Sequence, residues 1–67
     1  MNIFFNNERY QITEKTSILL LLNQFIGDKL TGIAVAINET VVPKKQWETY
    51  DLQPYDKVLV IKATQGG

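Results

Sequence analysis

The chain has 67 residues, 45% of them hydrophobic, and its seven basic and seven acidic residues cancel. This length supports one domain with one core, and the neutral charge removes the positive field that binding to nucleic acid or an anionic membrane normally requires. The absence of cysteine excludes disulfides and thiolate metal sites, and the absence of histidine removes the commonest general base, which argues against an independent enzyme.

Neither a membrane span nor a signal peptide is predicted. The longest apolar run, residues 18–22, falls far short of the roughly 20 residues that a spanning helix needs. The N-terminal segment MNIFFNNERY lacks the basic region and long apolar stretch of a signal peptide. We therefore expect a cytoplasmic, unprocessed protein with no membrane or nucleic-acid partner.

The first twelve residues predict a β-hairpin. MNIFF reads as a strand with Ile3 and Phe5 on one face and Phe4 on the other. The pair Asn6-Asn7 tolerates the positive φ angles of a tight turn, after which ERYQI returns as a second strand.

Residues 18–26 predict the main helix. Thr16 or Ser17 can serve as its N-cap, and Gly27 suits the left-handed position after its C-terminus. Leu19 and Leu20 fall partly outside the apolar stripe, so we expect one or two exposed leucines. The stripe itself has the spacing of a core-facing helix and consists of Ile18, Leu21, Leu22, Phe25 and Ile26.

Two strands and an irregular crossing follow the helix. GIAVAIN predicts a strand with Ile33, Val35 and Ile37 on one face and two small alanines on the other. VVP predicts a short edge strand that Pro43 ends, because proline cannot donate to a ladder. KKQWETYDLQPYD has helical or looped spacing, and its anchor candidates are Trp47, Tyr50 and Leu52.

The last apolar segment, KVLVIKA, predicts a central strand. One face carries Val58 and Val60, and the other carries Leu59, Ile61 and Ala63. The order of elements predicts an α+β fold of the β-grasp type, a mixed four- to five-stranded sheet packed on one main helix, with the first and last strands parallel and adjacent. We expect residues 1–63 to form this domain and residues 64–67 to form a flexible tail.

The tail, Thr64, Gln65, Gly66 and Gly67, directly follows the central strand. A chain ends in Gly-Gly by chance roughly once in 200 cases, and glycine lets a backbone pass close to another surface. The carboxylate of Gly67 would need activation by ATP before it could accept a sulfur nucleophile. Since the chain lacks a phosphate-binding loop, we expect it to be the substrate of another protein.

An apolar docking surface is predicted beside this tail. If Val58 and Val60 pack on the helix, then Phe4, Leu59 and Ile61 emerge together on the opposite face of adjoining strands. The alternative is that the crossing segment, with Trp47 or Tyr50, covers part of this face.

Residues 35–67 resemble the second half of the proteins of the ThiS family, which are the bacterial sulfur carriers of the thiamine pathway. Tyr55 departs from the family pattern, which usually has glycine there, and Lys44 replaces a frequent arginine. The resemblance rests on the strand and turn VAIN at 35–38, Val42-Pro43 followed by a basic residue, Trp47, Leu52, Asp56 before an apolar strand, and Gly66-Gly67.

The resemblance implies a ubiquitin-like β-grasp whose Gly67 carboxylate is adenylated by a ThiF-type enzyme and converted to a thiocarboxylate. That enzyme would supply ATP and magnesium, so the chain itself would hold no cofactor or metal. A sulfur-donor protein, such as a cysteine desulfurase, and a ThiG-type thiazole synthase would be further partners. The family's docking surface would correspond to Phe4, Leu59 and Ile61.

Four alternatives remain at this stage. The small subunit of molybdopterin synthase shares the fold, the Gly-Gly ending and the thiocarboxylate, but differs in its acceptor. A non-covalent β-grasp interaction module or a ubiquitin-like modifier would use the same scaffold differently. An enzyme built on Asp28, Glu39, Asp51 and Asp56 has little support, because their spacing fits turns and termini.

Overall fold

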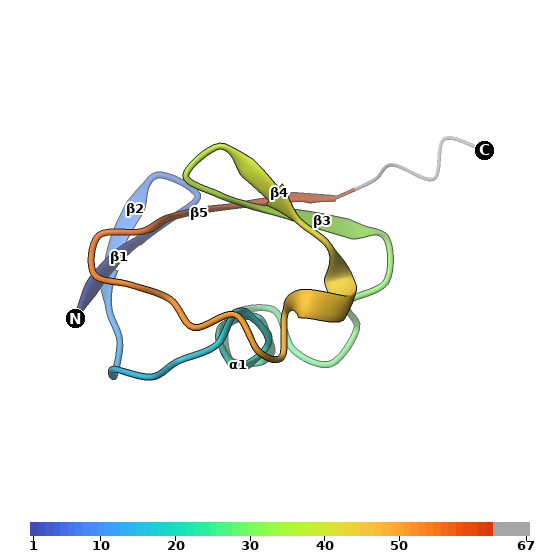
Figure 1. The fold of residues 1–67 in the computed structure, drawn as a ribbon. Coiled ribbons are helices and arrows are strands. Elements are labelled where there is room, and N and C mark those ends of the chain that lie inside the picture. Colours follow the sequence, from blue (N-terminus) through green and yellow to red (C-terminus); the bar gives the residue numbers. More distant parts are fainter. Residues whose placement is uncertain (63–67) are drawn as a thin grey trace.

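A computed structural model describes residues 1–62, which form a five-stranded sheet with one α-helix against one face (Figure 1). The strand order is β2-β1-β5-β3-β4, and β1 and β5 are parallel while the other neighbours are antiparallel. This confirms the predicted β-grasp and the central position of the last strand. The elements are β1 (Asn2–Phe5), β2 (Glu8–Gln11), α1 (Ile18–Phe25), β3 (Ile33–Ile37), β4 (Thr40–Val42), the 3₁₀ turn η1 (Lys44–Gln46) and β5 (Lys57–Lys62).

Residues 63–67, which contain Ala63 and the predicted tail, lie outside the described residues. The predicted boundary between domain and tail therefore stays a prediction.

Both hairpins turn through two residues with positive φ. Asn6 and Asn7 have φ of 49° and 71°, and Asn38 and Glu39 have φ of 50° and 72°. Two such residues match the right-handed twist of the flanking strands, and asparagine tolerates this conformation better than most side chains. The hairpin predicted at Asn6-Asn7 is confirmed.

The helix begins at the predicted cap but ends one residue earlier than predicted. Ser17 is the N-cap, and its Oγ accepts from the Leu20 N–H at 3.1 Å. At the other end, the N–H of Gly27, which has φ of 107°, donates to the Leu22 carbonyl at 3.1 Å. Ile26 is consequently the C-cap, and it is 36% exposed rather than part of the core. None of the helical segments within residues 1–62 is long and apolar enough to cross a membrane.

The crossing segment between β4 and β5 lies on the same side of the sheet as α1 (Figure 1). Trp47 and Leu52 are buried, as predicted, and Tyr50 is half-buried. The carbonyls of Tyr50 and Trp47 accept from the N–H groups of Ile18 and Leu19 at 2.9 and 3.1 Å. Because the first N–H groups of a helix have no partner within it, this segment completes the start of α1.

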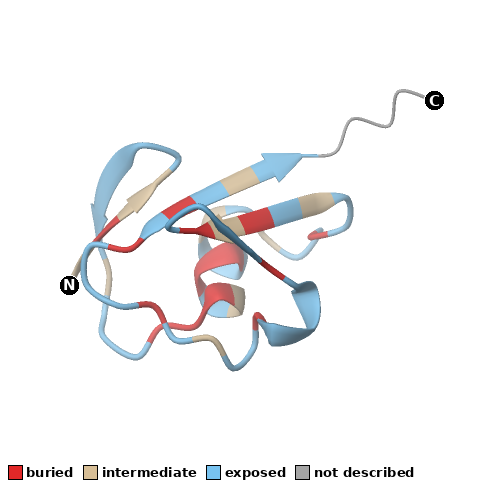
Figure 2. Cartoon of the chain, turned by 45° about the horizontal axis from the view of Figure 1, so that its top comes forward, coloured by how far each residue is buried: buried red, intermediate tan, exposed pale blue. Residues whose placement is uncertain are grey.

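The core fills the space between the sheet, α1 and the crossing segment (Figure 2). Every strand except β2 contributes a buried side chain to it, and β2 is exposed along its length. The buried members are Ile3, Ile18, Leu21, Leu22, Leu30, Val35, Ile37, Val42, Trp47, Leu52 and Val58.

Tyr55 occupies a strained backbone position in the turn before β5, and replacing it with glycine is expected to stabilise the protein. Its φ is 66° and its side chain is 64% exposed. A left-handed conformation costs an ordinary residue about 1–2 kcal/mol, and the extra unfolded-state entropy of glycine cancels part of that gain. We expect Tyr55→Gly to raise the free energy of unfolding by about 0.5–1 kcal/mol, and thus Tm by about 2–8 °C.

Thermal unfolding followed by circular dichroism measures this effect. The Tyr55 N–H donates to the Asn2 carbonyl, a bond that glycine keeps. Tyr55→Phe is the control and is expected to leave Tm unchanged, because phenylalanine bears the same strain. A lower Tm for Tyr55→Gly would contradict the argument.

Candidate functional site

The predicted docking residues share the face of the sheet that lies opposite α1. On β5, Leu59 and Ile61 are 44% and 52% exposed, whereas Val58 points into the core and is 2% exposed. Phe4 is half-buried and pairs with Lys57, which places it on the same face as Leu59 and Ile61. We call this surface the outer face.

The crossing segment does not cover the outer face. It packs against α1 on the other side of the sheet, where Trp47 Nε1 donates to the Val42 carbonyl at 2.9 Å. The alternative in which Trp47 or Tyr50 lies over Phe4, Leu59 and Ile61 is therefore wrong.

The outer face extends further than sequence reasoning predicted. On β3, Ala36 pairs with both Leu59 and Val41, and Ala34 pairs with Ile61. The side chains of Ala34, Ala36 and Val41 therefore continue the apolar surface across β3 to β4. Val41 is 68% exposed. The alternation of the two strands could have indicated these positions, but only the register shows which side chains lie side by side.

Basic side chains flank the outer face. Arg9 on β2 and Lys57 on β5 both pair with Phe4, and both are exposed. Between Phe4, Lys57 and Leu59 lies a hollow of about 300 Å³, which the acidic Glu39 also lines. An apolar surface with charges of both signs at its rim complements a partner surface that carries an apolar centre and charged residues of both signs at its edge.

The predicted tail residues Thr64, Gln65, Gly66 and Gly67 lie outside the described residues. The structure does establish where the chain leaves the sheet, since β5 ends at Lys62, at the opposite end of the molecule from Met1 (Figure 1). A chain of five residues spans at most about 17–18 Å. The roles of Gly67 and its neighbours stay a prediction.

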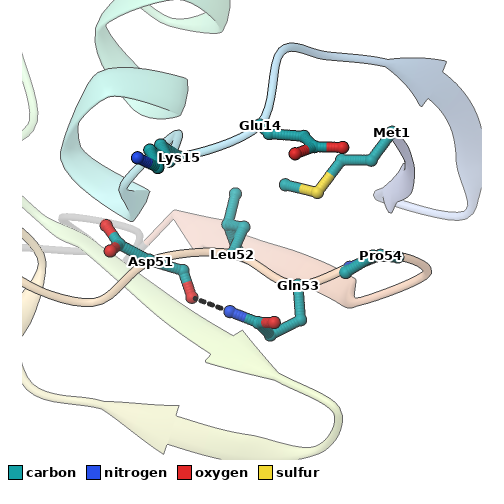
Figure 3. Close-up of a pocket in the computed structure, with 7 residues that line it drawn as sticks. All are labelled: Met1, Glu14, Lys15, Asp51, Leu52, Gln53 and Pro54. Carbon is teal, nitrogen blue, oxygen red and sulfur yellow. Dashed lines mark hydrogen bonds between the residues drawn. The ribbon is translucent and has the colours of Figure 1, made fainter.

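A second hollow, of about 330 Å³, lies where β1 begins, between the loop before α1 and the end of the crossing segment (Figure 3). Its charged side chains, Glu14, Lys15 and Asp51, are all exposed. Gln53 Nε2 donates to the Asp51 carbonyl at 3.4 Å on its wall. Among residues 1–62, no group of three or more metal-ligating side chains gathers.

The surroundings of Tyr10, on β2, shift the pKa of its hydroxyl group. Its hydroxyl donates to Glu8 Oε1 at 2.9 Å, and this hydrogen bond, followed by the charge of the carboxylate and by burial, raises the pKa of Tyr10 above its ordinary value. The phenol therefore stays protonated at neutral pH. Its ring stacks edge-on against Phe25 at 4.8 Å between centroids, which indicates a structural role.

Comparison with known proteins decides the family. The sequence model of the ThiS family matches residues 3–67. The chain belongs to the ThiS family. The sulfur carrier protein ThiS of Escherichia coli (strain K12) is 33% identical over 67 residues, which cover 100% of both chains. The ThiS resemblance predicted from residues 35–67 is confirmed, and the match extends it to the first half of the chain.

The ThiS fold is also found in a solved structure. The crystal structure of a thiamine biosynthesis protein (ThiS) from Geobacter metallireducens superposes with a TM-score of 0.86 at 19% identity and covers 100% of both chains. At this level of identity the likeness concerns the fold, which is the β-grasp predicted from the order of elements and the ubiquitin-like form of it that the family resemblance implied.

Proposed function

We propose that this chain is a sulfur carrier of thiamine biosynthesis and that the α-carboxylate of Gly67 is the atom group that carries sulfur. The observation that supports this most is the family match, which runs through Gly66-Gly67 and includes a curated relative named as a sulfur carrier. The central strand β5 supplies a rigid base from which the tail can reach into another protein's active site.

The proposed chemistry follows from the carboxylate. A carboxylate oxygen of Gly67 attacks the α-phosphorus of ATP, an acyl-phosphate bond forms, and pyrophosphate leaves. Hydrosulfide, or the terminal sulfur of a donor protein's persulfide, then attacks the carbonyl carbon of this acyl-adenylate and expels AMP. Attack by hydrosulfide leaves the thiocarboxylate directly. Attack by a persulfide leaves an acyl disulfide, whose S–S bond is reduced by thiols, which form a disulfide, to release the thiocarboxylate. Glycine suits both steps because no Cβ obstructs approach to the carbonyl.

Other proteins supply the catalysis. A ThiF-type enzyme provides ATP, magnesium and the groups that activate Gly67, and a sulfur-donor protein such as a cysteine desulfurase provides the sulfur. A ThiG-type thiazole synthase accepts it. The carrier itself is a protein co-substrate and not an enzyme, and its place is the cytoplasm, where these reactants meet. The outer face, with Phe4, Leu59 and Ile61, is the docking surface for these enzymes.

Intact-mass measurement tests the proposal. The protein is incubated with a ThiF-type enzyme, ATP, magnesium and a sulfur source, and an oxygen-to-sulfur gain at the C-terminus is expected. The thiocarboxylated product is then offered separately to a thiazole synthase and to molybdopterin synthase. Sulfur transfer to the second acceptor alone would overturn the assignment to thiamine biosynthesis. Attachment to lysines of other proteins, or an unchanged mass, would favour a modifier or a binding module.

Replacing Leu59 with glutamate is expected to weaken binding to the ThiF-type enzyme by about 10- to 100-fold. The side chain lies near the centre of the outer face, where an unpaired charge would be desolvated on docking. Since Leu59 is 44% exposed in the free protein, we expect the free energy of unfolding to change by no more than about 1 kcal/mol. Isothermal titration calorimetry measures the affinity.

The matched control is Leu20→Glu, the same substitution at a leucine that is 51% exposed on α1, on the other side of the sheet. It is expected to bind like the wild type. Equal affinities for the two variants would rule out the outer face as the docking surface.

A further inference from the structure

The first strand pairs with only the beginning of the last one. β1 pairs with β5 at Phe4↔Lys57 and Phe5↔Val58, and β5 continues to Lys62. Figure 1 shows β5 extending well past the end of β1. The far half of β5 therefore has a strand neighbour, β3, on one side, and on its other side β1 has already turned away.

The side chain of Asn6 closes the ladder between β1 and β5. The Asn6 N–H donates to the Val58 carbonyl at 2.9 Å, which is the last backbone contact from this strand. In a continued parallel ladder the Val60 N–H would donate to the backbone carbonyl of Asn6, but here it donates to Asn6 Oδ1 at 2.8 Å. An amide oxygen thus takes the place of a backbone carbonyl, and β1 stops there.

Beyond Asn6, no backbone group of the described residues pairs with this edge of β5. Backbone groups alternate between the two sides of a strand, so the carbonyl of Val60 and both the N–H and the carbonyl of Lys62 face the side that β1 has left. Within residues 1–62, the pairing of β1 with β5 includes no residue beyond Val58. An exposed edge of this kind is a template for another strand.

A hollow of about 420 Å³ lies beneath this edge. The hollow lies between the end of β1, the end of α1 and the far half of β5. Its lining residues are Phe5, Asn6, Phe25, Ile26, Val60 and Lys62. Its aromatic and aliphatic walls suit an apolar side chain, and Lys62 places a positive charge at its rim. The open edge and the hollow are adjacent because Val60 and Lys62 belong to both.

We propose that an extended segment of the adenylating enzyme adds to β5 at this edge, beside Val60 and Lys62, and inserts an apolar side chain into the hollow. The inference deepens the proposed function and rests on it, because it concerns how the enzyme grips the strand that leads to Gly67. Strand addition gains affinity from main-chain hydrogen bonds and specificity from pockets for alternate side chains.

The register determines which types of side chain the added segment carries at the positions that pair with Val60 and Lys62. Phe5 pairs with Val58 and both face α1, so the residues that pair with Val60 and Lys62 also face α1 and the hollow. The first is apolar, and the second is acidic because it meets the ammonium group of Lys62. Pairing at Lys62 sets the direction of the five residues that follow, and orientation of a reacting group is worth a large share of a catalysed rate.

The variant Lys62→Pro tests the proposal. It removes the N–H that faces the open edge and leaves the ladder to β3 intact, since the Lys62 N–H points away from β3. Lys62→Ala, which keeps the N–H, is the matched control. Relative to this control, the proline variant is expected to bind the ThiF-type enzyme at least tenfold more weakly, with an unchanged thermal midpoint. Hydrogen exchange of the wild type is expected to slow at the Lys62 amide when the enzyme is bound.

A second pair of variants tests the hollow. Ile26→Glu is expected to weaken binding by a similar factor, whereas Leu20→Glu, within the helix that Ile26 caps, is expected to bind like the wild type. Equal binding of Lys62→Pro and Lys62→Ala to the ThiF-type enzyme would overturn the inference. So would a result in which Lys62→Pro loses affinity for the thiazole synthase alone.

The proposed function and the inference of strand addition can fail independently of each other. If the wild type gains no sulfur but binds the enzyme, the affinities of the two Lys62 variants still decide the question of the edge. If the wild type gains sulfur and the two variants bind equally, only the inference of strand addition falls. If the wild type neither binds nor gains sulfur, both are wrong.

Discussion

Deleting Gly67 is expected to abolish the oxygen-to-sulfur mass gain in the presence of a ThiF-type enzyme, ATP and a sulfur source. The deletion moves the terminal carboxylate back by one residue, about 3.3–3.6 Å along an extended chain. A displacement of about 1 Å can already cost about 100-fold in rate. The shortened tail would therefore leave the carboxylate out of reach of the α-phosphate of ATP.

Two controls separate this loss from damage to the fold or to docking. The deletion lies beyond β5 in the sequence and leaves every buried core residue of the described part of the chain in place, so the free energy of unfolding and the affinity for the enzyme are expected to stay close to those of the wild type. Gln65→Ala, which keeps the length of the tail, is expected to gain sulfur. A deletion variant that becomes thiocarboxylated as fast as the wild type would refute the proposal that Gly67 is the acceptor.

Replacing Trp47 with alanine is expected to lower the free energy of unfolding by about 3–5 kcal/mol. The side chain is 2% exposed, and its Nε1 donates to the Val42 carbonyl at 2.9 Å. A domain of 67 residues has a total stability of about 3–10 kcal/mol. The variant should thus be partly or fully unfolded at 25 °C.

Urea unfolding followed by far-ultraviolet circular dichroism measures this loss, because the signal does not depend on the tryptophan. Trp47→Phe keeps much of the volume but leaves the Val42 carbonyl without its donor, which costs about 1–3 kcal/mol. The expected order of stability is wild type, Trp47→Phe, Trp47→Ala. An alanine variant within about 1 kcal/mol of the wild type would show that the crossing segment is dispensable to the core.

Local chemistry allowed most of the fold to be predicted. The pair Asn6-Asn7 marked a turn, Thr16-Ser17 marked the start of α1 to within one residue, and the alternation of β5 separated Val58 from Leu59. The exact end of α1 was missed by one residue, because the bond from Gly27 to Leu22 turns the chain before Ile26 can pack. Such a bond depends on backbone geometry that residue spacing does not contain.

The site was predicted only as far as one strand at a time allows. Period-two alternation placed Phe4, Leu59 and Ile61 on one face, and the structure confirms that placement. The contribution of Val41 and the open edge beyond Asn6 both depend on register between strands that are distant in sequence. The path of the crossing segment was equally hidden, because it is fixed by hydrogen bonds to the first turn of α1.

The parallel pairing of β1 with β5 has a consequence for biosynthesis on the ribosome. The first strand emerges early, but its partner at the centre of the sheet is made almost last. Until then, Ile3 and the apolar side of α1 lack the strand that covers them, so nascent chains would expose these surfaces throughout translation. Folding of this domain is therefore expected to be a late, concerted event that follows synthesis of residue 62.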